Sequence, residues 1–234
     1  MAKALIVVPT YNERENVEDI AGRLLVTLRD ADILFVDDNS PDGTGALLDE
    51  MARREPRIHV LHRAGKQGLG TAYIAGFRWG LAREYGYIFE FDADGSHDPK
   101  YLPHMLALAE GGADVVIGSR NVPGGGTMNW GIGRKLLSRG GSFYARTILG
   151  IHVRDVTAGF ICWRRRVLES LDLDRVDSNG YSFQIEMKYR ALQQGFKVVE
   201  TPIVFVDRRV GQSKMSRAIV GEALLKVWAL RLRR

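Results

Sequence analysis

The stretch ALIVVPTYNE (residues 4–13) opens with an apolar, β-branched-rich run and turns polar at a proline. Short apolar runs that end at a polar turn are typical of buried strands. The run ILFV (residues 33–36) repeats the pattern, and residues 15–28 between the two carry apolar side chains at helical spacing. This strand–helix–strand order predicts the start of a parallel α/β sheet.

Strand and helix patterns continue to alternate along the rest of the chain. Further strands are predicted at residues 58–61, 87–91, 115–117, 160–164 and 198–206. Further helices are predicted at residues 44–54, 69–85, 99–109 (with Asp98 as N-cap), 135–149, 183–194 and 215–232. We therefore expect an α/β fold with a mostly parallel central sheet and helices on both faces. The glycine-rich segment 121–133 breaks the pattern and is expected to be either a mobile lid or a poorly ordered connector.

The composition is that of a globular protein. The 234 residues are 45% hydrophobic and 26% charged, which excludes a disordered chain and allows one large domain or two small ones. The lone cysteine, Cys162, lies in an apolar strand pattern, so it is expected in the core and cannot form an internal disulfide. No apolar run is long enough for a signal peptide or a membrane span. The sequence therefore predicts a soluble or peripheral, cytoplasmic protein.

Polar residues follow four of the predicted strands. The segments PTYNE (9–13), DDNSPDG (37–43), DADGS (92–96) and GSR (118–120) each begin at or just after a strand, and three of the four are acidic. In parallel α/β sheets, ligands bind beyond the carboxyl ends of the strands. Each segment alone is equally well explained as turn and N-cap residues, but crowded acidic groups are costly unless they bind cations. Together, the segments indicate a site at this edge of the sheet.

The segment DAD at residues 92–94 is the sharpest local feature. Side chains alternate along an extended chain, so the carboxylates of Asp92 and Asp94 can point the same way. Mg²⁺ and Mn²⁺ suit such a pair, because they complete their coordination with water and substrate phosphates. The glycine position excludes a calcium loop, and no complete dinucleotide, NTPase phosphate-loop or nucleophilic-serine motif occurs. The five histidines show no metal-ligand spacing and are interpreted as structural or surface residues.

Five segments taken in order resemble the family-2 glycosyltransferases, and within them the polyprenol (dolichyl) phosphate mannose synthases. They are VPTYNEREN (8–16), VDDNSPDGT (36–44), DAD (92–94), GSR (118–120) and VDRRVGQSK (206–214). The resemblance implies a single GT-A catalytic domain with a Rossmann-like sheet, over residues 1–206. It also implies inverting transfer of mannose from GDP-mannose to a polyprenyl phosphate, with Mg²⁺ or Mn²⁺ as the cofactor.

The same resemblance assigns site residues by position in the motifs. Asp92, Asp94 and Ser96 would bind the metal, and Asp92, Asp94, Arg120 and Arg134 would be catalytic. The donor GDP-sugar would contact Pro9, Tyr11, Glu13, Val36, Asp38, Asp92, Ala93, Asp94, Ser96, Arg120, Arg208 and Lys214. The acceptor phosphate would be held by Arg120, Arg134 and Ser138, the last two in GRKLLSRG (133–140). Segments DVTAGF (155–160) and Q-x-E (184–186) also fit the family.

The chemistry of such a transfer does not require a general base. A phosphate monoester has its second pKa near ~6, so the acceptor is already a nucleophile at neutral pH. The leaving diphosphate gains negative charge, which a divalent cation and basic side chains would stabilise. We therefore expect cationic groups that bring the acceptor phosphate and the donor diphosphate together, and no dedicated carboxylate base.

The net charge of +5 is concentrated at the C-terminus. Residues 207–234 hold eight basic and two acidic residues, a net +6, and the preceding 206 residues carry −1. The near-neutral body argues against a nucleic-acid partner. The helix predicted in this basic segment either caps the core or lies on a membrane surface as a peripheral amphipathic helix at the cytoplasmic face. A membrane partner subunit is a further means of reaching a lipid acceptor.

Other functions remain as alternatives to mannosyl transfer. Within the family, the sugar could be glucose or another hexose, because epimers differ by few hydrogen bonds. The segment DADGS (92–96) approximates the nucleophile loop of a haloacid-dehalogenase-type phosphatase, but that loop belongs on a first strand. A non-catalytic nucleotide-sugar binding module is the third alternative.

Overall fold

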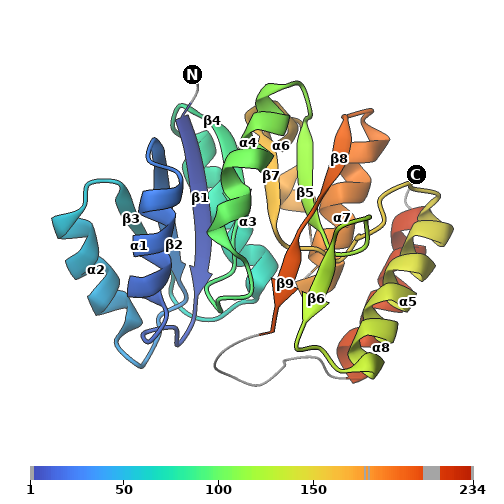
Figure 1. Ribbon diagram of the computed structural model, residues 1–234, viewed down its shortest axis with the longest axis horizontal. Helices are drawn as coiled ribbons and strands as arrows, with labels where there is room; N and C mark the ends of the chain where they lie inside the picture. Colours follow the sequence, from blue (N-terminus) through green and yellow to red (C-terminus); the bar gives the residue numbers. More distant parts are fainter. Residues whose placement is uncertain (1–2, 177, 179, 208–216, 233–234) are drawn as a thin grey trace.

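The structure is a computed structural model that describes residues 3–176, 178, 180–207 and 217–232, with only the backbone described over 217–224. The described strands form a seven-stranded sheet in the order β3-β2-β1-β4-β7-β5-β8 (Figure 1). Their bounds are β1 Lys3–Thr10, β2 Ala31–Asp37, β3 Ile58–His62, β4 Tyr85–Glu90, β5 Val115–Ser119, β7 Ile161–Arg164 and β8 Val198–Pro202. Neighbouring strands are parallel, except that β7 is antiparallel to β4 and β5. The predicted α/β fold with a mostly parallel sheet is confirmed.

Two cores lie on opposite faces of the sheet, because successive side chains of a strand point to opposite sides. In β1, Leu5 and Val7 enter one core, and Ile6 and Val8 enter the other. The second core is covered by α1 Val17–Thr27, α2 Thr44–Arg54 and α4 Leu102–Glu110. The first is covered by α3 Leu69–Leu81, α5 Ile132–Leu149, α6 Arg165–Ser170, α7 Gly180–Gln193 and α8 Arg217–Leu232. Cys162 is buried in the second core as predicted, where burial raises the pKa of its thiol.

Some predicted boundaries were wrong. The helix expected over 69–85 ends at Leu81, and Tyr85 already belongs to β4, where its hydroxyl donates a hydrogen bond to buried Asp32. The helix expected from Pro99 begins as a short 3-10 turn, η1 Pro99–Tyr101, before α4. Asp98 caps that turn as predicted, accepting a hydrogen bond from the backbone N–H of Lys100. Two short elements, α6 and the 3-10 turn η2 Leu173–Arg175, were not predicted, since single turns carry little periodic signal.

The segment predicted as one strand over 198–206 is two strands in two sheets. β8 ends at Pro202, and β9 Val204–Val206 leaves the large sheet to pair in parallel with β6 Gly126–Met128. The glycine-rich segment 121–133 is therefore not a poorly ordered connector along its whole length, because it contains a paired strand, and its role as a mobile lid stays a prediction. Pro202 has no backbone N–H to continue the ladder, and Ile203 instead donates its N–H to the carbonyl of Ser119. The two-strand sheet brings the start of α5 close to Asp207, directly after β9.

The last helix, α8, packs beside α5 and α7 at the end of the molecule beyond β8 (Figure 1). Val227 and Leu230 are buried in the first core, so this part of the basic segment caps the core. Leu225, Trp228 and Leu232 remain exposed on the same helix. Among the described residues, no helix has the length and apolar character needed to cross a membrane. The domain division at 206/207 and contact of α8 with a membrane stay predictions.

Candidate active site

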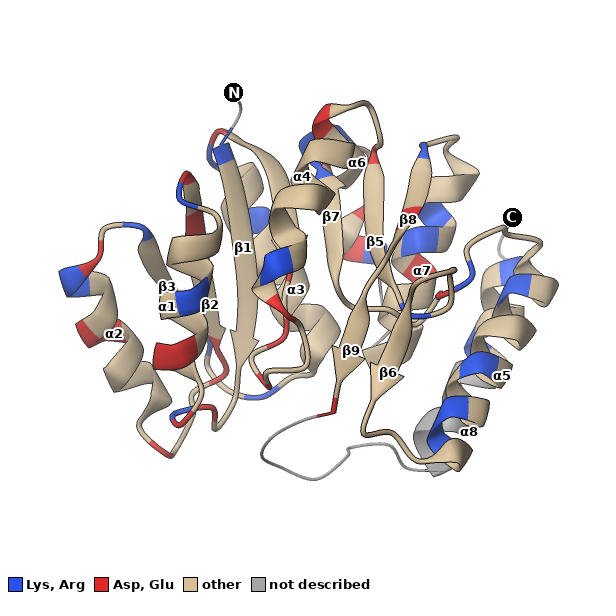
Figure 2. Ribbon diagram, in the orientation of Figure 1, with Lys and Arg blue, Asp and Glu red and all other residues tan. Residues whose placement is uncertain are grey.

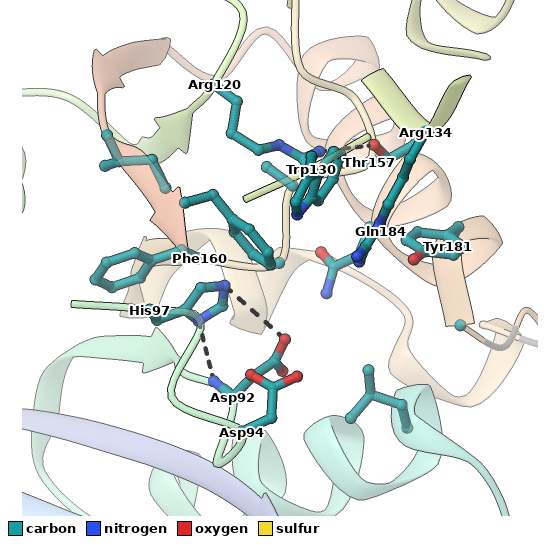
Figure 3. A pocket seen from close by; sticks show the side chains of 17 residues that line it. Asp92, Asp94, His97, Arg120, Trp130, Arg134, Thr157, Phe160, Tyr181 and Gln184 are labelled. Carbon is teal, nitrogen blue, oxygen red and sulfur yellow. Dashed lines mark hydrogen bonds and ion pairs between the residues drawn. The ribbon is translucent and has the colours of Figure 1, made fainter. Parts of the chain in front are cut away.

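A cavity of about 210 Å³ opens at the carboxyl ends of β4 and β5 (Figure 3). Acidic residues lie on one side of it, Asp92 and Asp94, in the loop that follows β4. Basic residues lie on the other side, with Arg120 directly after β5 and Arg134 in the first turn of α5. The four residues predicted to be catalytic are thus brought to one cavity from three different segments.

Local hydrogen bonds orient the carboxylate of Asp92. Its Oδ1 accepts a hydrogen bond of 2.7 Å from the hydroxyl of Tyr73 on α3. Burial raises the pKa of Tyr73 well above its ordinary value, so this hydroxyl keeps its proton and acts as the donor. The backbone N–H of Asp92 donates to Nδ1 of His97 at 3.1 Å. These bonds fix both the backbone and the side chain of Asp92 at the cavity wall.

His97 is buried against the site. It stacks on Phe160 with ring centroids 4.8 Å apart, and burial lowers the pKa of its imidazole. In the neutral ring, Nδ1 accepts from Asp92, so the proton is on Nε2, which lies 3.9 Å from Oδ2 of Asp92. His97 is structural, as interpreted from the sequence, but it also lines the cavity and supports Asp92.

The donor atoms of the loop after β4 suit a small divalent cation. Asp92 and Asp94 present carboxylate oxygens to one cavity, and two carboxylates with room for phosphate oxygens are what Mg²⁺ or Mn²⁺ takes. Within the described residues, no cluster of three or more Asp, Glu, His or Cys side chains is arranged for a metal. Ser96 lies behind the loop, 1% exposed; its N–H donates to Asp94, and its Oγ has no hydrogen-bond partner among the described residues. Ala93 is buried between the two aspartates.

Arg120 is held rigidly by Asp155. Its Nε and Nη2 donate to the two carboxylate oxygens of Asp155 at 2.7 and 2.6 Å, and its backbone N–H donates to the same side chain. Thr157 accepts a further bond from Nη2. Burial alone would raise the pKa of Asp155, but the charge and hydrogen bonds of Arg120 hold it below its ordinary value. This buried ion pair keeps a fixed guanidinium at the edge of the cavity.

Arg134 faces the same region with a different set of contacts. Its Nη1 donates to Asp207 at 2.7 Å, and its guanidinium lies 4.1 Å from the ring centroid of Trp130. The guanidinium of Arg120 lies 5.4 Å from the same ring. Trp130 therefore contacts both predicted acceptor arginines through its aromatic face. Ser138, one turn beyond Arg134, lines a smaller neighbouring cavity with Trp130 and Arg120.

The predicted nucleoside residues lie at the same edge of the sheet, outside the lining of the main cavity. Pro9 and Val36 face each other in the β1–β2 pairing, next to β4. Asp38 is buried and accepts a 2.7 Å bond from Arg63, and burial raises the pKa of its carboxyl. Tyr11 lies under the ammonium of Lys66, and Glu13 accepts a bond from Asn16. Arg208 and Lys214 lie outside the described residues.

Several site residues were missed or left without a role by sequence reasoning. Tyr73 and Trp130 support Asp92 and the arginines, yet they occur in a helix pattern and a glycine-rich segment that gave no warning. Asp155 and Gln184 lie in segments that resemble the family, but only the structure shows that Asp155 pairs with Arg120 and that Gln184 lines the cavity. For Trp130, a position four residues before the predicted anion-binding Arg134 is a signal that could have pointed to it.

Comparisons with known proteins find similar sequences and structures. Residues 5–172 match the model of a family described as glycosyl transferase family 2. The chain is 51% identical to the polyprenol monophosphomannose synthase of Mycolicibacterium smegmatis, covering 98% of this chain and 88% of that protein. It is 50% identical to the undecaprenyl-phosphate mannosyltransferase of Micrococcus luteus, covering 99% and 96%.

A solved structure shows the same fold at low sequence identity. The glucosyl-3-phosphoglycerate synthase of Mycobacterium tuberculosis, in complex with Mn²⁺, UDP-glucose and phosphoglyceric acid, superposes with a TM-score of 0.72. The two are 17% identical, and the match covers 98% of this chain and 80% of that one.

Proposed function

The chain belongs to glycosyl transferase family 2 and has a GT-A-like fold, and from this premise we propose that it transfers mannose from GDP-mannose to a polyprenyl phosphate with inversion. One observation carries the proposal. A single cavity presents two carboxylates on one side and two arginines on the other. Such a cavity suits a reaction in which a metal-bound diphosphate leaves and a second phosphate attacks. The two relatives that are half identical over nearly the whole chain bear names of mannose transfer to a polyprenyl phosphate, which supports this acceptor and this sugar.

The donor is proposed to bind on the carboxylate side. Asp92 and Asp94 would hold Mg²⁺ or Mn²⁺, which when bound stabilises the negative charge that develops on the leaving GDP. Tyr73 and His97 orient Asp92 for this task through the bonds described above. The donor would also contact Ala93 and Ser96 of the loop, Arg208 and Lys214 beyond the described residues, and the nucleoside residues Pro9, Tyr11, Glu13, Val36 and Asp38.

The acceptor phosphate is proposed to bind on the arginine side. Arg120 is already fixed by Asp155, so it can orient a phosphate without losing side-chain freedom. Arg134 adds a second positive charge, and Ser138 would add one hydrogen bond. A dianionic phosphate needs no proton removed, so positioning by cations is the task left to these residues.

The proposed acceptor is a membrane lipid, and exposed apolar side chains on α5 and α8 support peripheral attachment at the cytoplasmic face. On α5, Ile132, Leu136 and Phe143 lie along one stripe and are each exposed. Arg139 and Arg146 belong to the same stripe, and Figure 2 shows basic residues along α5. Leu225, Trp228 and Leu232 are exposed on the neighbouring α8. Apolar residues interleaved with arginines favour contact with an anionic bilayer surface.

Vesicle flotation tests this attachment. The protein should float with vesicles containing anionic lipid at low salt, and less at high salt. Replacing Trp228 and Leu225 by serine should reduce flotation, and replacing exposed Val26 on α1 by serine should not. No flotation at either salt concentration would contradict the proposal and favour a membrane partner subunit.

A donor panel tests the reaction itself. The protein is incubated with labelled GDP-mannose, UDP-glucose and other nucleotide sugars, a short polyprenyl phosphate and Mg²⁺ or Mn²⁺. GDP-mannose alone is expected to give a lipid-linked sugar, and a chelator should stop the reaction. Product from UDP-glucose instead would make the protein a glucosyltransferase, and no product from any donor would overturn the proposal.

A further inference from the structure

Gln184 on α7 lines the cavity, although the residue is almost completely buried, with only 3% of its surface exposed. Figure 3 shows this amide between Arg134 and the two aspartates. Its Nε2 donates a hydrogen bond to Oε2 of Glu90, the last residue of β4. Its Oε1 has no hydrogen-bond partner among the described residues.

The orientation of the amide is set from behind by Glu90. The other oxygen of this fully buried carboxylate accepts a 2.7 Å bond from Nε1 of Trp163 on β7. In the structure the NH₂ group of Gln184 faces Glu90 as the hydrogen-bond donor, and the carbonyl oxygen lies on the other side of the amide. One N–H of the amide is thus bound to Glu90, and Oε1 is left as an acceptor for a ligand in the cavity.

A second contact fixes the backbone of α7 at this point. The ammonium of Lys188, one turn further along α7, donates to the carbonyls of Val156 and Ala158 at 3.0 and 2.6 Å. It also donates to the carbonyl of Gln184 itself. The helix is thus tied to the segment 155–159 that holds Arg120 through Asp155. The position of Gln184 relative to the arginine side of the cavity is determined by these buried bonds.

Gly159 lies close to both the amide of Gln184 and the carboxylate of Asp92. A Cβ added there would lie 3.5 Å from Nε2 of Gln184 and 3.8 Å from Oδ2 of Asp92. Gly159, Gln184 and Asp92 all line the same cavity. A ligand held at Asp92 would therefore lie in the cavity that Gln184 lines.

We propose that Oε1 of Gln184 accepts a hydrogen bond from a hydroxyl of the transferred sugar and so helps to select the donor. This inference rests on the proposed function of the site. Phosphate oxygens that carry no proton cannot donate to Oε1, whereas the sugar attached to a metal-bound diphosphate carries several hydroxyl donors. Gln184 is thus a specificity-determining residue, and Glu90 and Trp163 are positioning residues that hold the amide through hydrogen bonds.

The test compares a ligand that has the sugar with one that lacks it. Affinities for GDP-mannose and for GDP are measured by calorimetry with Mn²⁺, in the wild type and in Gln184→Met, which keeps the length of the side chain and removes the acceptor. We expect Gln184→Met to weaken GDP-mannose binding by about 10-fold, as for one lost hydrogen bond, and to leave GDP binding unchanged. Gln193→Met, an exposed position on the same helix, is the matched control and should change neither affinity.

Deoxy analogues of GDP-mannose give a second measurement, the first part of which uses the wild type alone. In the wild type, the analogue that lacks the partner hydroxyl should bind about 10-fold more weakly, and Gln184→Met should weaken its binding no further. Equal losses for GDP and GDP-mannose in the variant, or a wild type indifferent to every deoxy position, would overturn the inference.

The inference and the proposed function fail in different ways. A wild type that makes lipid-linked mannose while Gln184→Met binds GDP-mannose normally refutes the role of Gln184 alone. A wild type that binds neither GDP nor GDP-mannose refutes the proposed function, and the inference with it.

Discussion

The two sides of the cavity are built in different ways. The carboxylate side is one short loop, in which Asp92 and Asp94 are two residues apart and His97 contacts Asp92 from five residues away. The arginine side joins distant segments, with Arg120 bound to Asp155 over 35 residues and Arg134 to Asp207 over 73. The loop brings its two carboxylates together along the chain, with Tyr73 of α3 orienting Asp92, whereas the arginines depend on distant segments to face that loop. Variants on the carboxylate side should therefore lower activity and leave the free energy of unfolding nearly unchanged. Variants on the arginine side should lower both.

The largest effect is expected on the carboxylate side. Asp94→Asn removes one negative charge from the proposed metal site, so metal-dependent transfer should fall by about 10³-fold or more, or ~4 kcal/mol. The free energy of unfolding should stay within about 0.5 kcal/mol, because the amide oxygen of the variant can still accept the N–H of Ser96 and the position is only half-buried. Initial rates with Mg²⁺ or Mn²⁺ and urea unfolding measure the two quantities. Asp30→Asn, an exposed position at the far end of β2, is the control, and unchanged turnover in Asp94→Asn would exclude the metal role.

Asp155→Asn should have the largest effect on the stability of the arginine side. Loss of this carboxylate leaves the charge of Arg120 buried and unpaired, which costs about 3 kcal/mol of unfolding free energy. Urea unfolding at pH 7, followed by tryptophan fluorescence, measures the loss. A loss below about 1 kcal/mol would show that Arg120 finds another partner, and would contradict the greater dependence of the arginine side on distant contacts.

The same ion pair predicts a pH dependence. The pKa of Asp155 is lowered in the folded state, so its contribution to stability is present above the unfolded pKa, near ~4, and is lost as pH falls through the folded pKa. The wild type should therefore lose more stability than Asp155→Asn when pH falls below about 4. Parallel acid-dependence curves for the two proteins would contradict this role.

A smaller effect is expected from Arg134→Ala, which should weaken use of the acceptor. Removing one charge-assisted contact to the lipid phosphate should raise the KM for polyprenyl phosphate about 30-fold, or ~2 kcal/mol. The KM for GDP-mannose should change little. Steady-state kinetics with each substrate varied separately measure both constants. An effect confined to GDP-mannose would place Arg134 on the donor side and break the division between the two sides.

Trp130→Leu should have the smallest effect. The ring contacts the guanidiniums of Arg134 and Arg120, and a cation–π contact of this kind is worth about 1 kcal/mol. The KM for the acceptor should therefore rise about fivefold, with kcat nearly unchanged. Trp130→Phe, which keeps an aromatic face, should restore most of the loss. Equal losses in both variants would assign Trp130 a packing role instead.

The predictable parts of the molecule are those whose signal is local. The buried strands around residues 4–8 and 33–36 and the helix α2 were found from the spacing of neighbouring apolar residues. Asp92 and Asp94 were found because they are adjacent to a strand end and to each other. The strand after Pro202 was misassigned, because its apolar residues fit the large sheet as well as the small one.

The sequence by itself determined the alternation of strands and helices, the acidic loop after β4 and, through its motifs, the family of the protein. Strands and helices repeat their side-chain direction every two and every 3.6 residues, so the order of neighbouring apolar and polar residues indicates them without a structure. Only the tertiary structure decided that β7 runs antiparallel, that Asp155 holds Arg120, and that Glu90 orients Gln184 across 94 residues. Such contacts depend on which distant segments pack together, and no local period encodes that choice.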